Sequence, residues 1–219
     1  TAWTYNGQVP GPEIRVREGD IVQVTLKNFL PESTTIHWHG IPLQNAMDGV
    51  PGITQPGVKP GETFVYEFEA KPAGSFIYHS HAGLQLDQGL VGPLIIEPNN
   101  DPGDFDREFT LVLEDWVMKD GGGTADTQRR QNGHMMGGGM MGRRRGPRRG
   151  GSRPGDPMLE PVYDAYAVNG RVGRAISDLK VRKGERVKLR ICNPSAATIY
   201  YLRLAGHTMV ITDTDGNSI

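Results

Sequence analysis

Hydrophobic residues in this chain fall in short runs, and glycine and proline residues separate one run from the next. The runs are rich in Val, Ile, Thr, Phe and Tyr, residue types that fit a pleated, half-buried strand. Many short strands at close spacing, with turn signals between them, are typical of an all-β sandwich or barrel. The expected strands span residues 21–26, 63–69, 76–79, 94–97, 109–115, 186–192 and 208–212.

One sequence pattern occurs twice along the chain. Its first copy has YNGQV at residues 5–9 and IRVREGDIV at residues 14–22. The second copy has VNGRV at residues 168–172 and LKVRKGERV at residues 179–187, an offset of 163 to 165 residues. Two copies of one β-domain are therefore predicted, as in a duplicated sandwich.

The second copy is interrupted by residues 119–157, which hold 12 of the 30 glycines and eight arginines. This segment has no periodicity that could bury a face, so it is predicted to be a mobile, basic insertion. The first domain is assigned to residues 1–100 and the second to residues 101–219. After Asn169 only 50 residues follow, whereas the first copy needs about 90 after its Asn-Gly pair. The second domain is therefore expected to be incomplete, and the natural protein to extend further.

Composition excludes several classes of protein. The 219 residues include 30 glycines and 16 prolines, about twice the average usage, which disfavours helices. With 37% hydrophobic residues, 22% charged residues and a net charge of -1, the chain is neither a coiled coil nor wholly disordered. No run approaches the roughly 18 apolar residues of a membrane-spanning helix. The arginine-rich insertion lacks the interleaved aromatic residues that stack on bases, so no nucleic acid is expected as a partner.

Four of the six histidines form two His-x-His pairs, His37 with His39 and His79 with His81. Residues two apart on a strand share a face, roughly 6 to 7 Å apart, so both imidazoles of a pair project the same way. This separation suits neighbouring metal ions better than chelation of one ion. The single cysteine, Cys192, excludes a multi-thiolate site within the chain, which leaves histidine and carboxylate as ligands. Imidazole ligands fit Zn, Cu, Fe or Ni, and chance alternation on a β surface is the simpler alternative.

Four segments of the first copy resemble a known protein family. TIHWHG at 35–40, GSFIYHSH at 74–81, QGLVG at 88–92 and YNGQVPGP at 5–12 look like the first cupredoxin domain of multicopper oxidases, the laccase-like enzymes. The resemblance continues through residues 109–116 and 167–216 as the start of a second such domain. It implies an all-β, cupredoxin-like Greek-key β-sandwich. Ile77 departs from the family pattern, since many relatives carry an aromatic residue there.

The resemblance implies an oxidase that couples four one-electron oxidations to the reduction of dioxygen to water. A type 1 copper receives electrons from the donor and passes them to a cluster of one type 2 and two type 3 coppers. Carried over by position, His37 would ligate the type 2 copper, and His39, His79 and His81 the type 3 pair. Asp48 matches an acidic residue that relatives use to relay protons, although it also suits a turn in Met47-Asp48-Gly49.

Several family features are missing from these 219 residues. The other four cluster histidines and the type 1 ligands come from motifs near the family's C-terminus, so the type 1 copper is expected in a C-terminal part outside this chain. The isolated chain is therefore expected to be inactive. In the second copy Tyr200 and Leu202 stand where His37 and His39 stand in the first. Cys192 is expected to be a buried structural thiol and His207 a structural histidine.

The electron donor stays open among phenols, aromatic amines and Cu(I). His134, Met135, Met136, Met140 and Met141 in the insertion are a candidate site for Cu(I), because thioethers prefer soft ions. The family resemblance implies a periplasmic or secreted location and, as partners, dioxygen, a small-molecule or metal-ion donor and the remaining C-terminal part. The rival hypothesis is a copper-binding or degenerate cupredoxin scaffold without oxidase activity.

Overall fold

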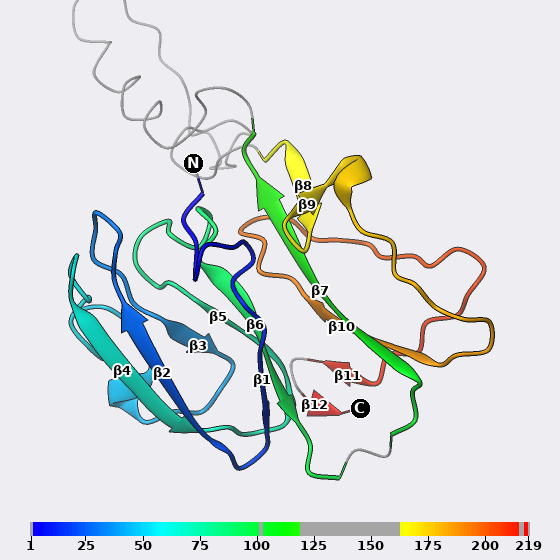
Figure 1. The fold of residues 1–219 in the computed structure, drawn as a ribbon, viewed down its shortest axis with the longest axis horizontal. Helices are drawn as coiled ribbons and strands as arrows, with labels where there is room; N and C mark the ends of the chain where they lie inside the picture. Colours follow the sequence, from blue (N-terminus) through cyan, green and yellow to red (C-terminus); the bar gives the residue numbers. More distant parts are fainter. Residues whose placement is uncertain (1, 101–102, 119–162, 215–216, 219) are drawn as a thin grey trace, which may run out of the picture. The chain divides into compact units, whose positions relative to one another are not determined.

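The computed structural model describes residues 2–100, 103–118, 163–214 and 217–218. Within these ranges the regular structure consists of strands and two single-turn 3₁₀ helices, in agreement with the all-β prediction (Figure 1). In chain order the elements are β1 (Ile14–Arg17), β2 (Ile21–Lys27), β3 (His37–His39), η1 (Asn45–Met47), β4 (Thr63–Glu69), β5 (Gly74–His79), β6 (Val91–Glu97), β7 (Arg107–Trp116), β8 (Ala165–Val168), β9 (Arg171–Val172), η2 (Gly173–Ala175), β10 (Val187–Cys192), β11 (Asp213–Thr214) and β12 (Asn217–Ser218).

Residues of the first sequence copy form two sheets that share one hydrophobic core. One sheet has the strand order β1-β6-β5-β3, and the other pairs β2 with β4. β1 runs parallel to β6, whereas β5 runs antiparallel to both of its neighbours. Both sheets contribute to the core, which includes Val22, Leu26, Trp38, Tyr66, Phe68, Phe76, Tyr78, Leu94 and Ile96.

Alternation along β3 and β5 decides which side chains enter this core. Trp38 is fully buried, and its ring lies 4.7 Å from that of Phe68 and 5.9 Å from that of Tyr78, measured between centroids. Since successive side chains of a strand point to opposite faces, the histidines on either side of Trp38 point away from the core. The packing of one tryptophan therefore fixes the direction of both imidazoles.

The repeat found in the sequence is also a repeat of backbone conformation. Asn6 and Asn169 both have φ of 51°, and the glycines that follow them, Gly7 and Gly170, have φ of 78° and 71°. Positive φ at both central residues is the hallmark of a type I′ turn, for which Asn-Gly is the favoured pair. In both copies the residues that flank the turn pair antiparallel. The two Asn-Gly segments are therefore equivalent turns.

The second copy forms a sheet of order β10-β7-β8-β9, in which β10 runs parallel to β7. The prediction of a strand at residues 208–212 is wrong, because the next strand, β11, begins at Asp213. Val210 and Ile211 are 80% and 68% exposed, and no described segment pairs with this stretch. A hydrophobic run forms a strand only where neighbouring backbone completes its hydrogen bonds.

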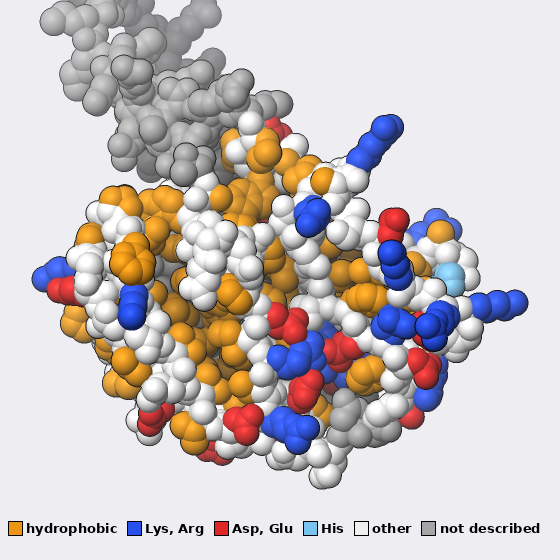
Figure 2. All heavy atoms as spheres, in the orientation of Figure 1, with side chains coloured by type: hydrophobic (Ala, Val, Ile, Leu, Met, Phe, Trp, Pro, Cys, Tyr) orange, Lys and Arg blue, Asp and Glu red, His pale blue; other side chains and the backbone are white. Residues whose placement is uncertain are grey.

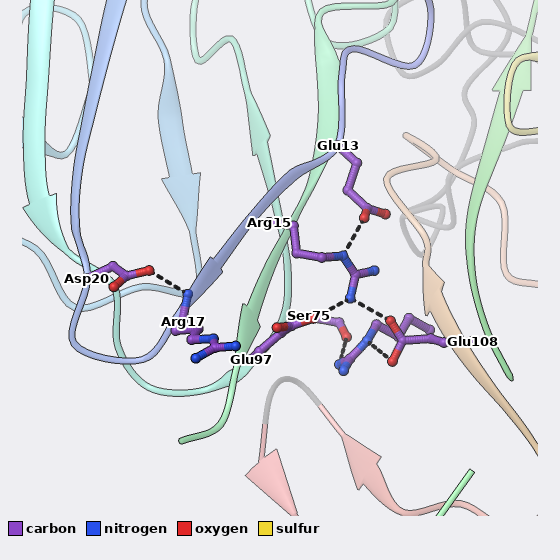
Figure 3. A network of polar contacts seen from close by, with 8 residues as sticks. Glu13, Arg15, Arg17, Asp20, Ser75, Glu97 and Glu108 are labelled. Atoms are coloured by element: carbon purple, nitrogen blue, oxygen red, sulfur yellow. Dashed lines mark hydrogen bonds and ion pairs between the residues drawn. The ribbon is translucent and has the colours of Figure 1, made fainter. Parts of the chain in front are cut away.

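Charged side chains join the two copies within one compact part of the molecule. Arg15 on β1 donates to Glu97 at 2.9 Å and to Glu108 on β7 at 2.7 Å (Figure 3). The other oxygen of Glu108 lies 3.0 Å from Nε of Arg190, whose Nη1 donates to Ser75 on β5. Burial would raise the pKa of Glu108, but hydrogen bonds from Arg190 and Arg15 outweigh it and hold that pKa below its usual value. Figure 2 shows charges of both signs gathered in the region between β1 and β7.

The thiol of Cys192 is buried and unpaired, as predicted from its place in a strand. Its Sγ lies 3.8 Å from the carbonyl oxygen of Phe76, and burial raises its pKa to about 11. The thiol is therefore protonated at neutral pH, which makes it a poor metal ligand or nucleophile.

Glu114 on β7 is a buried carboxyl group with an incomplete set of partners. One oxygen accepts a hydrogen bond of 3.0 Å from the Gly170 amide, and the other, Oε1, is buried without a partner among the described residues. Burial raises the pKa of Glu114 from 4.5 to about 7. The protonated form is therefore the one that the fold accommodates.

This raised pKa predicts a pH-dependent stability. Below pH 4.5 both the folded and unfolded chains carry a protonated Glu114, and its contribution is then fully present; as pH rises through 7 that contribution is lost. We expect Glu114→Gln to gain on the order of 2 kcal/mol relative to wild type between pH 4.5 and 7.5, because glutamine stays neutral. Urea denaturation of both proteins at the two pH values measures this difference. A Glu32→Gln variant controls for net charge at an exposed position. The prediction would be contradicted if the free energies of unfolding of Glu114→Gln and wild type differed by the same amount at both pH values.

Two compact units divide the chain. One contains Thr1–Asp115 and Tyr166–Ile219, and the other contains Trp116–Ala165. The predicted insertion at residues 119–157, with its histidine and methionines, lies outside the described residues. Its role and the domain boundary assigned near residue 100 stay predictions. Among the described residues, no helix has the length and apolar character that crossing a bilayer requires.

Candidate metal centre

Three of the four paired histidines lie on the neighbouring strands β3 and β5, and His81 follows the end of β5. β3 and β5 pair antiparallel, with His37 directly opposite His79 and Trp38 opposite Tyr78. Since Trp38 and Tyr78 point into the core, the imidazoles of His37, His39 and His79 share the other face. The common face expected from the spacing is thus present, and the strand register brings the pairs together.

Three of the four imidazoles form a tight group. One ring nitrogen from each of His37, His39 and His79 lies within 4.8 Å of the other two. His39 Nδ1 and His79 Nε2 lie 3.3 Å apart, within hydrogen-bonding distance of each other. His81 lies just outside this group, with its ring centroid 5.3 Å from that of His37 and 6.1 Å from that of His79.

Backbone carbonyls select which nitrogen of two imidazoles is free to bind a ligand. His37 Nδ1 lies 2.7 Å from the carbonyl oxygen of Asp48, and His79 Nδ1 lies 2.8 Å from that of Ser80. A carbonyl oxygen only accepts hydrogen bonds, so each Nδ1 carries the proton and each Nε2 keeps its lone pair. Such contacts are typical of metal-binding histidines, whose second nitrogen is held by an outer partner.

Burial favours the uncharged form of His79. This side chain is buried, and burial together with the neighbouring histidines lowers its pKa to about 4. The imidazole is therefore neutral at physiological pH, the form that binds metal ions.

Asp48 lies next to His37 because the backbone at Gly49 packs closely against the backbone at Ile36. It follows η1, and its Oδ1 lies 3.4 Å from His37 Nδ1, beyond the shorter contact that its own carbonyl makes. The next residue, Gly49, has φ of 76°, and a Cβ there would overlap the carbonyl oxygen of Ile36. The turn interpretation of Met47-Asp48-Gly49 and the placement of Asp48 at the histidines are thus compatible, because the glycine permits the approach.

A polar layer behind the histidines was not foreseen from the sequence. Ser80, between His79 and His81, points into the protein, where its hydroxyl donates to Gln85 Oε1 at 2.7 Å and lies 3.2 Å from Thr34 Oγ1. All three polar side chains are buried. The one signal in the sequence was the polar residue at the inward position of His-Ser-His, because buried serine requires a partner.

The remaining sequence candidates lie elsewhere. Tyr200 donates its hydroxyl to the carbonyl oxygen of Glu114, and Leu202 is exposed. His207 is exposed as well, with Nδ1 3.0 Å from the carbonyl oxygen of Ala205. None of the three belongs to the group of side chains that, among the described residues, could hold a metal ion.

The donor set fits copper. Two nitrogens bound to one ion at about 2 Å, at an angle near tetrahedral, are separated by roughly 3.3 Å. The His39 and His79 nitrogens have this separation. Imidazole donors without thiolate suit copper, and Nε2 of His37 and His79 is kept available by the contacts of Nδ1.

Known proteins with similar sequences include multicopper oxidases and copper-resistance proteins. Two sequence models of the multicopper oxidase family match the chain, one over residues 1–101 and the other over residues 107–219. Multicopper oxidase MmcO of Mycobacterium tuberculosis is 35% identical over 97% of this chain and 42% of its own length. Copper resistance protein A of Pseudomonas syringae pv. tomato is 34% identical over the whole chain and 39% of its own length.

Solved structures show the same likeness. A multi-copper oxidase from Pseudomonas thermotolerans matches with a TM-score of 0.70 and 36% identity, over 94% of this chain and 44% of its own. The blue copper oxidase of Nitrosomonas europaea matches with a TM-score of 0.67 and 34% identity, over 89% of this chain and 54% of its own. The chain thus spans about two fifths of the length of these curated relatives.

Proposed function

The chain belongs to the multicopper oxidase family, and we propose from this that it is part of a laccase-like oxidase. Such an enzyme couples one-electron oxidation of a donor to the four-electron reduction of dioxygen to water. The observation that carries the proposal is the group of three imidazoles on β3 and β5, with a fourth beside it. Its fold, an all-β cupredoxin-like sandwich, is the one its structural relatives have.

The four histidines are proposed as copper ligands of a trinuclear cluster. His39 and His79 would share one type 3 copper, because their nitrogens are 3.3 Å apart. His81 would be a further ligand of the type 3 pair, and His37 would hold the type 2 copper. When bound, copper supplies reversible one-electron transfer and a place where dioxygen accepts electrons. A neighbouring type 1 copper is proposed in the C-terminal part of the complete protein.

Asp48 is the proposed proton carrier. Water formation consumes protons, so a carboxyl group that exchanges them with solvent is useful near the site. The Asp48 side chain is 32% exposed, and its Oδ1 faces His37 Nδ1 at 3.4 Å. The proposed role of this partly exposed carboxylate is therefore to exchange protons with solvent beside the cluster.

The electron donor is proposed to be a phenol, an aromatic amine or Cu(I). The names of relatives cover different chemistry: L-ascorbate oxidase of Nicotiana tabacum is 34% identical over 98% of this chain, and the Pseudomonas relative is named for copper resistance. The Cu(I) hypothesis for the insertion adds His134 and its neighbouring methionines to this proposal. A periplasmic or secreted location is proposed with it.

The second candidate is a copper-binding protein without oxidase activity, which the copper-resistance name of one relative favours. Oxygen uptake by the copper-loaded complete protein distinguishes the two. With a phenolic donor and separately with Cu(I), we expect four electrons consumed per dioxygen and no peroxide released. Bound copper without oxygen uptake from either donor would favour the second candidate, and the isolated 219-residue chain is expected to consume no oxygen.

A further inference from the structure

A buried polar network lies on the inner side of the loop that joins β5 to β6. Gln85 is its centre, and its side chain is 4% exposed by residue area. Its Oε1 accepts from the Ser80 hydroxyl at 2.7 Å, and its Nε2 donates to the carbonyl oxygen of Ser33 at 2.9 Å. Its backbone amide donates to Ala82 and its carbonyl accepts from Leu90. Both ends of the side chain and both backbone groups are thus engaged.

Ser80 connects this network to the metal centre. Its carbonyl oxygen accepts from His79 Nδ1 at 2.8 Å, while its amide donates to the carbonyl oxygen of Leu90 at 3.0 Å. Its hydroxyl contacts Gln85 and Thr34 and accepts from the Ala82 amide at 3.2 Å. One residue therefore holds the outer nitrogen of His79 and also anchors the chain leading to His81.

We propose that Gln85 is a positioning residue for the copper centre: through the Ser80 hydroxyl it fixes the peptide that orients His79 and leads to His81. This inference rests on the proposed copper-binding function. The side-chain amide of Gln85 joins the segment before β3 to the segment after β5. It bonds to Ser33, which precedes His37 and His39, and to Ser80, which lies between His79 and His81. Gln85 thereby holds the two pairs at a fixed separation.

Loss of either hydrogen bond would loosen this arrangement. A buried donor or acceptor without a hydrogen-bond partner destabilises the folded state. The Ser80 hydroxyl would therefore turn toward another acceptor, or a water molecule would enter and bond to it. Any rotation of the Ser80 peptide shifts the carbonyl that holds His79 Nδ1. The opposite nitrogen, Nε2, would then move away from the 3.3 Å separation that it keeps from His39. Removing outer partners of metal ligands typically lowers metal affinity about 10- to 100-fold.

The test is Gln85→Met in the complete protein, since methionine has a similar length and no hydrogen-bonding amide. Copper content is measured after dialysis against graded concentrations of a competing chelator, and the bound Cu(II) is examined by electron paramagnetic resonance. We expect at least a tenfold loss of copper affinity and an altered Cu(II) spectrum. Ser80→Ala should also lower the copper affinity, and the double variant should lose less than the sum of the two single variants, because both substitutions remove the same Ser80–Gln85 hydrogen bond.

Gln55→Met is the matched control, because Gln55 is also buried and its amide bonds to the carbonyl oxygen of Pro56 rather than to the histidine loop. It should bind copper as wild type does. Equal copper affinity and equal spectra for wild type, Gln85→Met and Ser80→Ala would overturn the positioning role. A fall in the thermal midpoint of the metal-free protein, with unchanged copper affinity, would overturn it too. Failure of the wild type itself to bind copper would instead refute the proposed function.

Discussion

Replacing His39 and His79 together with alanine is expected to abolish oxygen reduction. These residues supply two ring nitrogens of the group, 3.3 Å apart, and no other described side chain takes their place in it. Metal ions contribute several kcal/mol to catalysis, so we expect oxygen uptake to fall at least about a thousandfold. Copper content, measured by atomic absorption on the dialysed complete protein, should fall by at least one ion per molecule.

His207→Ala is the control for this experiment, since that histidine is exposed and outside the group. It should retain both copper and oxygen uptake. The far-ultraviolet circular dichroism of the double variant should match that of wild type, because both side chains lie on the face opposite the core. Wild-type copper content together with wild-type oxygen uptake in the double variant would show that these histidines are not ligands.

The second large effect is expected at Arg190, which pairs with Glu108 in the ion network that Arg15 also joins. Its side chain is 7% exposed and lies 3.0 Å from Glu108, which is 13% exposed. Arg190→Met removes the more buried partner of Glu108 and leaves Arg15 as the other. Breaking a buried pair from one side costs about 3 to 5 kcal/mol, and with Arg15 in place we expect the lower end of that range. Urea denaturation at pH 7 should reveal a loss of that size in the free energy of unfolding.

Two comparisons sharpen this second experiment. Lys71→Met removes an ion pair with Glu69 in which both side chains are about half exposed, so its effect should stay below about 1 kcal/mol. The double variant Arg190→Met/Glu108→Leu should be more stable than Arg190→Met, because it removes the buried carboxylate that the single variant leaves with Arg15 as its remaining partner. An effect at Arg190 no larger than that at Lys71 would mean that solvent reaches the network.

The sequence predicted the first copy better than the second for a physical reason. In the first copy every long strand has a described partner, so the strands at residues 21–26 and 63–69 formed as expected. Residues 208–212 have a similarly hydrophobic pattern, but no described segment completes their hydrogen bonds. Local residue preference alone cannot supply that pairing.

The candidate site, too, was only partly predictable from the sequence. The common face of His37 and His39 follows from the period of a strand, and the sequence therefore predicted it. His81 lies beyond the end of β5, so strand period does not place it. The contact between His37 and His79 depends on strand register, and the roles of Gln85 and Arg190 depend on contacts across 52 and 115 residues respectively. Pairings of that range leave no periodic trace in one sequence. Asp48 lies between these cases, since the family resemblance suggested it and the backbone approach that Gly49 permits brings it close to His37.

The fully buried indole of Trp38 has a consequence for how the protein must be prepared. β3 has only three residues, and a slip of one position against β5 would exchange the indole with an imidazole, because side-chain direction alternates along a strand. A slipped β3–β5 pair could keep much of the surrounding sandwich and still be unable to take up metal. The fraction of metal-competent molecules in a preparation is then decided when these two strands pair, before copper is supplied. Adding copper during folding, rather than to the purified protein, would favour the productive register by mass action.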